Sequence, residues 1–309
     1  MWNNQIVEWL LEGDISIQYQ VYRDLLQTIR PDLQKRIEKE GWGAQFLAAR
    51  NRDGEWGEGF FDPGWTCTHY TLLDLKNLSL SSHQPEIRKV ISGVLSKEKR
   101  KDGGINPQKR TVQSDVCLNG MFLNYAAYFG ADKKELRSVI DFLISQQMPD
   151  GGFNGRRNRG GALHSSLHST LSVLEGILEY RQNGYNYRIN DLRRIEEEAR
   201  EFLLDRHLFR SHTTGEIIDL RMLRLVYPCR WRYDILRVLD YFKFAGTKFD
   251  HRMTDALDIL LRKKRPDKKW VLQAQYPGKT HFKMEEVRQP SRWNTLRTMR
   301  VLLHFGIIP

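Results

Sequence analysis

A short turn that contains Asp and Gly recurs along this chain at almost constant spacing, and no other feature constrains the fold as strongly. It reads RDGEWG, KDGGI and PDGGF, and more weakly PDKKW, at residues 52–57, 101–105, 149–153 and 266–270. The aspartates Asp53, Asp102 and Asp150 are 49 and 48 residues apart. A period of this length is typical of repeat proteins in which each repeat is one supersecondary unit.

Helical patterns lie on both sides of these turns. In the segment 133–148, Leu136, Val139, Ile140 and Leu143 follow one another at i, i+3, i+4 and i+7, which places them on one face of a helix. The whole chain then divides into six helix pairs. The first helices are expected at 3–12, 31–50, 84–99, 133–148, 190–207 and 249–264, and the second at 15–28, 64–79, 113–129, 162–181, 228–245 and 291–305.

These pairs predict an all-α protein, because no stretch alternates apolar and polar residues in the manner of a strand. A single pair cannot bury its apolar face alone, and the second helices are the more apolar. We therefore expect an (α/α)6 toroid with the second helices inside. The repeat leaves no linker, so residues 1–309 are expected to form one domain. The inner helices would begin at one end, where their dipoles favour an anion.

The composition fits a globular protein and adds a preference for anions. Hydrophobic residues make up 40% and charged residues 28%, which excludes a disordered chain. With 49 Lys and Arg against 38 Asp and Glu, the net charge is +11, which favours nucleic acid, a membrane surface or a phosphorylated small molecule. No apolar run approaches the roughly 20 residues of a transmembrane segment, and no signal-peptide pattern opens the sequence, so we expect a cytoplasmic protein. The three cysteines should be free thiols or metal ligands.

The best-formed turn resembles a known repeat. Residues 142–153 read FLISQQMPDGGF, which resembles the Gln-Trp repeat of squalene and hopene cyclases and of the β subunits of protein prenyltransferases, with Phe153 in place of the usual Trp. The resemblance implies an α/α toroid of six helix pairs. It does not extend to the chemistry of those cyclases, because they use an Asp-x-Asp-Asp acid and this chain contains no Asp-Asp dipeptide.

A second resemblance concerns the basic segment that follows. Protein prenyltransferases carry Gly-Gly-(Phe/Tyr)-x-Gly-Arg-x-x-Lys-x-x-Asp-x-Cys, in which the basic residues hold an isoprenoid diphosphate, and the Asp and Cys, with a later His, bind zinc. Residues 151–164 here read GGFNGRRNRGGALH. Arg156 matches the family Arg, Arg159 replaces the Lys, and His164 stands where the family has Cys.

Potential metal ligands stand at the starts of three consecutive inner helices. They are Cys67 and His69, then Asp115 and Cys117, and then His164 and His168. Thiolate, imidazole and carboxylate groups are zinc ligands, and three of them with one open position suit catalysis. Zinc is therefore the candidate cofactor, and Asp115, His164 and His168 are the candidate catalytic residues. The alternative is that the cysteines are small buried side chains and the histidines are hydrogen-bonded core residues.

Basic and aromatic side chains at the same end are candidates for ligand binding. Guanidinium groups match phosphate oxygens bidentately, and aromatic rings line apolar sites or face cations. The candidates are Arg156, Arg159, Arg230, Trp65, Tyr70, Tyr125, Trp231 and Trp293. The alternatives are a solvated basic loop and aromatic rings that only pack. The long segment 265–290 is expected to be a lid or a binding loop.

Together these patterns favour an isoprenoid or other amphiphilic ligand, with its anionic head at Arg156 and Arg159 and its chain against the aromatic residues. If the protein is an enzyme, the resemblance implies a transferase assisted by zinc at Asp115, Cys117 and His164. Basic residues gathered at one end favour a small anionic ligand over nucleic acid, and they leave open a helical partner subunit.

Two other classes of function compete with this one. The first is a non-catalytic toroid that binds an acidic protein or a nucleic acid over its basic surface. The second is a glycan-processing enzyme, which needs two carboxylates across a cavity. Only Asp115, Asp219 and Asp234 are placed to supply them.

Overall fold

The structure is a computed structural model that describes residues 4–108 and 112–307, except for the side chains of residues 158 and 159. Within these residues every regular element is helical, and the only β pairs are isolated bridges. The all-α prediction is confirmed. Among the described helices, none is long and apolar enough to cross a membrane. The α-helices are α1 (Asn4–Leu11), α2 (Ile15–Asp24), α3 (Pro31–Arg36), α4 (Gly41–Ala48), α5 (Thr68–Asn77), α6 (Pro85–Lys97), α7 (Val116–Tyr128), α8 (Arg137–Ser145), α9 (Arg157–Gly160), α10 (Leu167–Gln182), α11 (Ile189–Leu204), α12 (Ile235–Phe244), α13 (Thr254–Arg262) and α14 (Arg292–His304), and the 3-10 helices are η1 (Gly64–Thr66), η2 (Leu220–Leu223) and η3 (His251–Met253).

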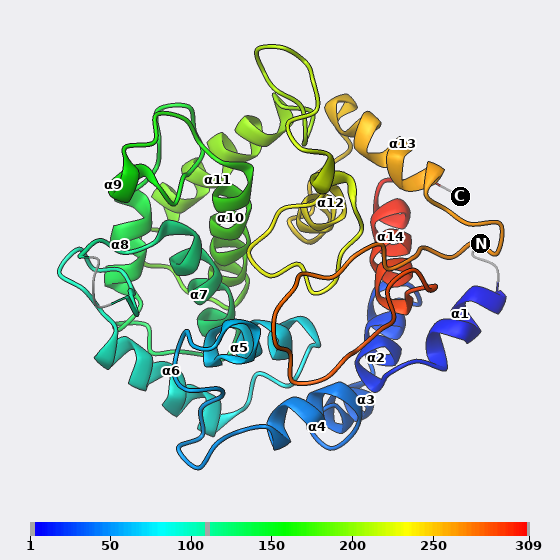
Figure 1. Cartoon of the computed structure of the whole chain (residues 1–309), viewed down its shortest axis with the longest axis horizontal. Helices are drawn as coiled ribbons and strands as arrows, with labels where there is room; N and C mark the ends of the chain where they lie inside the picture. Colours follow the sequence, from blue (N-terminus) through cyan, green and yellow to red (C-terminus); the bar gives the residue numbers. More distant parts are fainter. Residues whose placement is uncertain (1–3, 109–111, 308–309) are drawn as a thin grey trace. The chain divides into compact units, whose positions relative to one another are not determined.

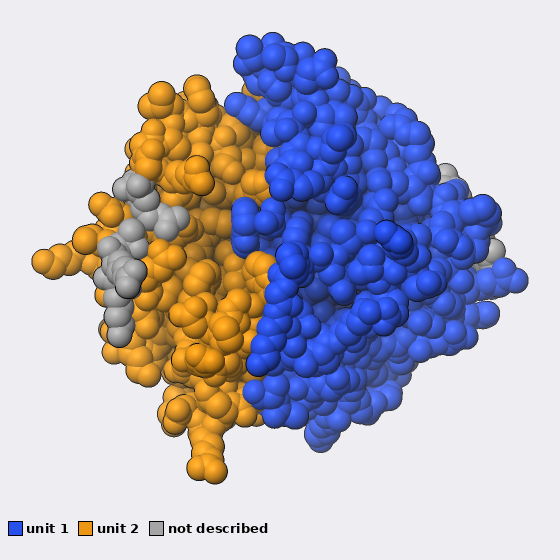
Figure 2. Space-filling view, viewed as in Figure 1, with its two compact units in different colours: residues 1–49, 77–81, 206–309 blue, residues 50–76, 82–205 orange. Residues whose placement is uncertain are grey.

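The chain is organised as two compact units, which Figure 2 colours separately. Unit 1 comprises residues 1–49, 77–81 and 206–309, and unit 2 comprises residues 50–76 and 82–205. Unit 1 therefore contains α1 to α4 and α12 to α14, whereas unit 2 contains α6 to α11 and nearly all of α5. The single domain and the closed toroid stay predictions.

The second helix of each pair is the more buried one. Helices α5, α7, α10, α12 and α14 are buried around almost their whole circumference. By contrast, α6, α8, α11 and α13 each bury one stripe, such as Val139, Ile140 and Leu143 of α8. A helix buried on all sides lies within a core, and a helix with one apolar stripe covers it. The expected difference between first and second helices is confirmed for these elements.

Several helix starts differ from the sequence prediction. The expected helix at 31–50 is two helices, because the chain turns at Gly41, whose φ of +62° lies in the left-handed region. The expected helix at 228–245 begins only at Ile235. There the Asp234 carboxylate caps the helix by accepting a 2.8 Å hydrogen bond from the backbone N–H of Arg237.

Helices α7 and α10 lie side by side in unit 2 (Figure 1), and two glycines allow their close approach. A Cβ atom added to Gly120 would lie 2.7 Å from the backbone of Ser172, and one added to Gly176 would lie 2.4 Å from the carbonyl oxygen of Gly120. Both distances are shorter than a carbon–oxygen contact of about 3.3 Å. The backbones of the two helices therefore touch where neither residue has a side chain.

The repeated turns share one backbone conformation. Gly54, Gly103 and Gly151 have φ values of +84°, +88° and +86°, a region that glycine occupies without a steric cost. In the fourth turn Lys268 takes the same place with φ of +59°. The weak fourth copy of the sequence repeat is therefore a turn of the same kind, with a lysine at the position that favours glycine.

The apolar residue after each turn is held by a side chain of the following helix. Trp56, Ile105, Phe153 and Trp270 are at most 1% exposed. Their backbone N–H groups donate to side-chain oxygens of Thr68, Asn119, Thr170 and Thr295, at 2.9, 2.7, 2.9 and 3.0 Å respectively. The same side chains donate back to the carbonyl oxygens of these apolar residues. These reciprocal bonds fix each turn against the next inner helix, and the sequence analysis missed them.

Candidate functional site

Aromatic rings surround His69 at the start of α5 in unit 2. The ring centroids of Phe60, Phe61, Tyr70 and Tyr125 lie 5.5, 5.4, 4.9 and 5.5 Å from that of His69. Trp65 continues the group, edge to face with Tyr70 at 4.8 Å. We call these six residues the aromatic cluster. It brings together three candidate ligand-binding residues, and its two phenylalanines come from the Gly-rich loop before α5, which the sequence analysis did not single out.

His69 is the polar centre of the aromatic cluster. Its Nδ1 atom lies 3.1 Å from the Tyr125 hydroxyl, and its Nε2 atom is buried without a hydrogen-bond partner among the described residues. Burial lowers the pKa of His69 to about 3, so the ring is neutral at pH 7. Burial and the neighbouring Cys67 raise the pKa of Tyr125, which keeps its proton. The cluster therefore offers an apolar surface with one neutral hydrogen-bonding group.

The basic turn after the third repeat lies against the start of α7. Asp115 caps α7 by accepting a 2.8 Å hydrogen bond from the backbone N–H of Leu118. A Cβ atom on Gly155 would lie 3.4 Å from the Asp115 carboxylate, so this part of the turn touches that carboxylate. The next residue, Arg156, is exposed. Asp115 and Arg156, which come from two different repeats, are thus neighbours through Gly155.

The other basic residues of this turn differ in role. The Arg157 guanidinium donates to the carbonyl oxygens of Ser145 and Gln147, and so it closes the end of α8. Arg157 is therefore engaged by the backbone, whereas Arg156 is exposed. The Arg159 side chain lies outside the described residues.

His164 and His168 do not share a helix face, as their spacing had suggested. Helix α10 begins at Leu167, so His164 lies in the preceding loop, exposed, with its carbonyl oxygen accepting from Asn154 at 2.7 Å. The loop is held in place by Ser165, whose hydroxyl and backbone N–H both donate to Asp150 of the repeated turn. This tie to the turn keeps residues 162–166 out of the helix.

The predicted zinc ligands are engaged in other contacts. Cys117 lies 3.4 Å from the Ser172 hydroxyl between α7 and α10, and Cys67 is fully buried. In the described ranges, no three His, Cys, Asp or Glu side chains form a group that could hold a metal ion. The candidate ligands as they stand here do not fit a zinc site, and zinc stays a prediction for metal analysis.

The remaining candidate aromatic and basic residues belong to unit 1. Trp293, the second residue of α14, has its ring centroid 4.7 Å from that of Tyr227. Trp231 lies before α12 instead of inside it, and the Arg232 guanidinium stands 4.6 Å above its ring. Arg230 is buried beside them in sequence, with a left-handed φ of +55°.

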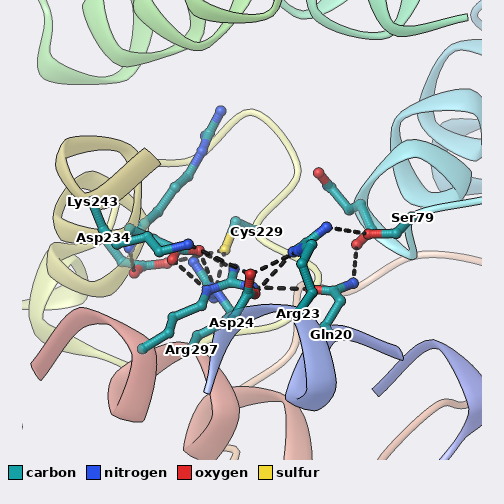
Figure 3. Close-up of polar contacts among 12 residues, drawn as sticks. Gln20, Arg23, Asp24, Ser79, Cys229, Asp234, Lys243 and Arg297 are labelled. Carbon is teal, nitrogen blue, oxygen red and sulfur yellow. Dashed lines mark hydrogen bonds and ion pairs between the residues drawn. The ribbon is translucent and has the colours of Figure 1, made fainter. Parts of the chain in front are cut away.

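A buried ionic network joins α2, α12 and α14 in unit 1, and Figure 3 shows much of it. Arg300 of α14 contacts Asp240 through two guanidinium nitrogens at 2.7 and 2.5 Å, and it also contacts Asp24 at 2.8 Å. Although burial acts to raise it, Arg300 and Arg297 hold the pKa of Asp240 below its usual value. Paired and hydrogen-bonded charges of this kind tolerate burial. The sequence analysis missed the network, because its members come from helices far apart in the chain.

Cys229 sits at one end of this network, before α12. Its sulfur lies 3.3 Å from Asp234 Oδ2 and accepts from Arg297 Nη1 at 3.6 Å. Burial, followed by the charge of Asp234, raises the pKa of Cys229 to about 12, so it is a neutral thiol at pH 7. Burial also raises the pKa of Asp234. The group therefore resembles a structural thiol more than a reactive thiolate.

The long segment 265–290 is anchored to α14. The Glu285 carboxylate accepts from the Ser291 hydroxyl at 2.5 Å and from the Trp293 backbone N–H at 3.1 Å, at the positive end of the helix. Phe282 packs its ring 4.6 Å from that of Phe46. A carboxylate from this segment therefore occupies the start of α14, where the sequence analysis had expected helix ends that could receive an anion.

The comparisons point to terpene cyclases among solved structures, while no protein-family model and no curated protein sequence matches the chain. The chain is similar to the type II terpene cyclase MstE from Scytonema. The apo structure of that enzyme aligns over 88% of this chain and 96% of its own, with 14% identity and a TM-score of 0.36. A structure of an MstE variant with geranylgeranyl dihydroxybenzoate, given as its substrate, aligns over 92% of this chain and 97% of its own, with 14% identity and a TM-score of 0.35.

Proposed function

We propose that this chain is an (α/α)6 toroid that binds an isoprenoid or other lipid-like ligand with an anionic head group. The head would lie at Arg156 and Arg159, and the apolar chain would lie against the aromatic cluster. If the protein is an enzyme, the reaction would be a transfer to or from that ligand. Two observations support the proposal: a basic turn lies at the start of α7, and an apolar cluster lies further along the same helix.

The separation between these two parts carries the proposal. Asp115 caps α7, and Tyr125 lies ten residues further along the chain within this helix. At about 1.5 Å per residue, this places the aromatic cluster about 15 Å from the start of α7. An extended prenyl or acyl chain can span that distance. An amphiphile could therefore contact the basic turn and the aromatic rings together, which neither a small anion nor a sugar would need.

The test is binding of farnesyl diphosphate by isothermal titration calorimetry, with the double variant Arg156→Ala, Arg159→Ala. Loss of two charge-assisted contacts should weaken binding about 100-fold. The matched control is Arg194→Ala, since Arg194 is an exposed arginine of the same unit that pairs with Glu198. Unchanged affinity in the double variant would reject the head-group site.

The competing classes would give different results. A toroid that binds acidic macromolecules would bind arbitrary DNA with steep salt dependence and would show no thermal shift with prenyl diphosphates. For a glycan-processing enzyme, the three candidate carboxylates are those of Asp115, Asp219 and Asp234. Each of them caps a helix by accepting a backbone hydrogen bond. A carboxylate engaged in this way is poorly placed to act as a catalytic acid or base.

A further inference from the structure

Trp293 and Arg297 form a group of buried hydrogen-bond donors on one face of α14. They are four residues apart, so their side chains lie one turn apart on the same side of the helix. The ring of Tyr227 contacts both, at 4.7 Å from the Trp293 ring centroid and 5.9 Å from the Arg297 guanidinium carbon. Trp293 is 2% exposed and Arg297 is 5% exposed. We call these two residues, with Tyr227 and Cys229, the Arg297 site.

The donors of the Arg297 site exceed its acceptors. The indole Nε1–H of Trp293 is buried and has no acceptor among the described residues. The Arg297 guanidinium carries five N–H donors, and its acceptors in the described part of the chain are one oxygen of Asp240 at 3.3 Å and the Cys229 sulfur at 3.6 Å. Sulfur is a weak acceptor, and a buried donor without a partner is costly. The site therefore lacks an acceptor.

The charge of the surrounding network is also positive. Among the described residues, the network holds five cationic side chains and three carboxylates, so its formal charge is +2. These are Arg23, Arg237, Lys243, Arg297 and Arg300 against Asp24, Asp234 and Asp240. Cys229 is a neutral thiol and does not supply the missing negative charge. Buried charges are ordinarily paired, and a buried surplus of cations attracts an anion.

We propose that the Arg297 site binds a small oxyanion, either a free phosphate or the head group of a larger ligand. Arg297 would donate from its guanidinium and Trp293 from its indole N–H. The shared chemistry is an anionic group with several acceptor oxygens, which would satisfy both donors and balance the surplus charge. The site lies wholly within unit 1 and goes beyond the proposed function, whose head-group contacts lie in unit 2.

The test is calorimetric binding of sodium pyrophosphate to the full chain at constant ionic strength. Arg297→Gln should weaken binding about 10- to 100-fold through loss of a charge-assisted contact. Asp240 keeps both of its contacts with Arg300 in this variant, so we expect it to fold. Trp293→Phe keeps the ring and removes only the N–H, and it should weaken binding about fivefold. The control is Arg221→Gln, because Arg221 is an exposed arginine of the same unit that pairs with Asp219.

The possible outcomes separate this site from the one in unit 2. Loss of pyrophosphate binding in Arg297→Gln and Trp293→Phe, but not in Arg221→Gln, supports the Arg297 site. Competition by farnesyl diphosphate would then assign it to a head group, and lack of competition would assign it to a free anion. Wild-type protein that does not bind pyrophosphate overturns the inference. Binding lost only in the Arg156 and Arg159 double variant also overturns it, while leaving the proposed function intact.

Discussion

Gly176→Ala should destabilise the protein, because it adds a methyl group where α7 and α10 touch. The new Cβ atom would lie 2.4 Å from the carbonyl oxygen of Gly120, whereas a carbon–oxygen contact needs about 3.3 Å. The helices would have to separate by about 0.9 Å, and a backbone oxygen within a helix cannot turn away. Overpacking of a core costs about 1–3 kcal/mol, and here we expect the upper end.

The alanine also brings a favourable term, which a second variant isolates. Replacing Gly by Ala inside a helix gains about 1 kcal/mol from helix propensity. At Gly93 in α6, an added Cβ atom would meet nothing within 4 Å. Gly93→Ala should therefore raise the free energy of unfolding by about 1 kcal/mol, whereas Gly176→Ala should lower it by about 2 kcal/mol.

The assay is unfolding by guanidinium chloride and by heat, followed by circular dichroism. At about 2 °C per kcal/mol for a chain of this size, Gly176→Ala should lower Tm by about 4 °C and Gly93→Ala should raise it by about 2 °C. Opposite signs for one chemical change would locate its cause in the helix contact. A neutral or stabilising effect of Gly176→Ala would refute the close approach of α7 and α10.

Two further predictions concern buried polar groups. Thr170→Val keeps the shape of the side chain but leaves the buried N–H of Phe153 without its 2.9 Å partner, so the free energy of unfolding should fall by about 1–3 kcal/mol in guanidinium titrations; no loss would mean that the reciprocal bonds add nothing. Asp240→Asn should cost about 3–5 kcal/mol near neutral pH, because it leaves Arg297 and Arg300 short of a buried counter-charge. Since the pKa of Asp240 is lowered in the folded state, the stability from its charge is present above its ordinary pKa and is lost as pH falls below about 4. The difference between wild type and Asp240→Asn should shrink there, and a difference independent of pH would contradict the pairing.

The architecture could be predicted from the sequence because the repeat and the helical periodicity are local signals. The turn glycines and the apolar stripe of α8 each lie within a few residues, and both are found in the structure. The starts of the inner helices could not be predicted as well. Helix α10 begins late because Ser165 bonds to Asp150, fifteen residues earlier in the chain, and this contact has no local pattern.

The candidate site was predicted only in part, for a related reason. Trp65, Tyr70 and Tyr125 do lie in one cluster, and Asp115 does lie beside the basic turn. Residue type alone did not separate a metal ligand from a ring in an aromatic core, and His69 is surrounded by aromatic side chains. Its environment is set by the loop before α5 and by α7, which are distant in the sequence.

The ionic network did leave one signal in the sequence. The helix expected at 291–305 was assigned to the buried ring, yet it carries Arg297 and Arg300 between the apolar residues Leu296, Met299 and Val301. Arginine is almost never fully buried unless it is paired. Two arginines on a helix that must be inside therefore require buried carboxylates or a bound anion. Asp24 and Asp240 supply the carboxylates for Arg300, and the incomplete pairing of Arg297 is what makes an anion at its guanidinium the next measurement.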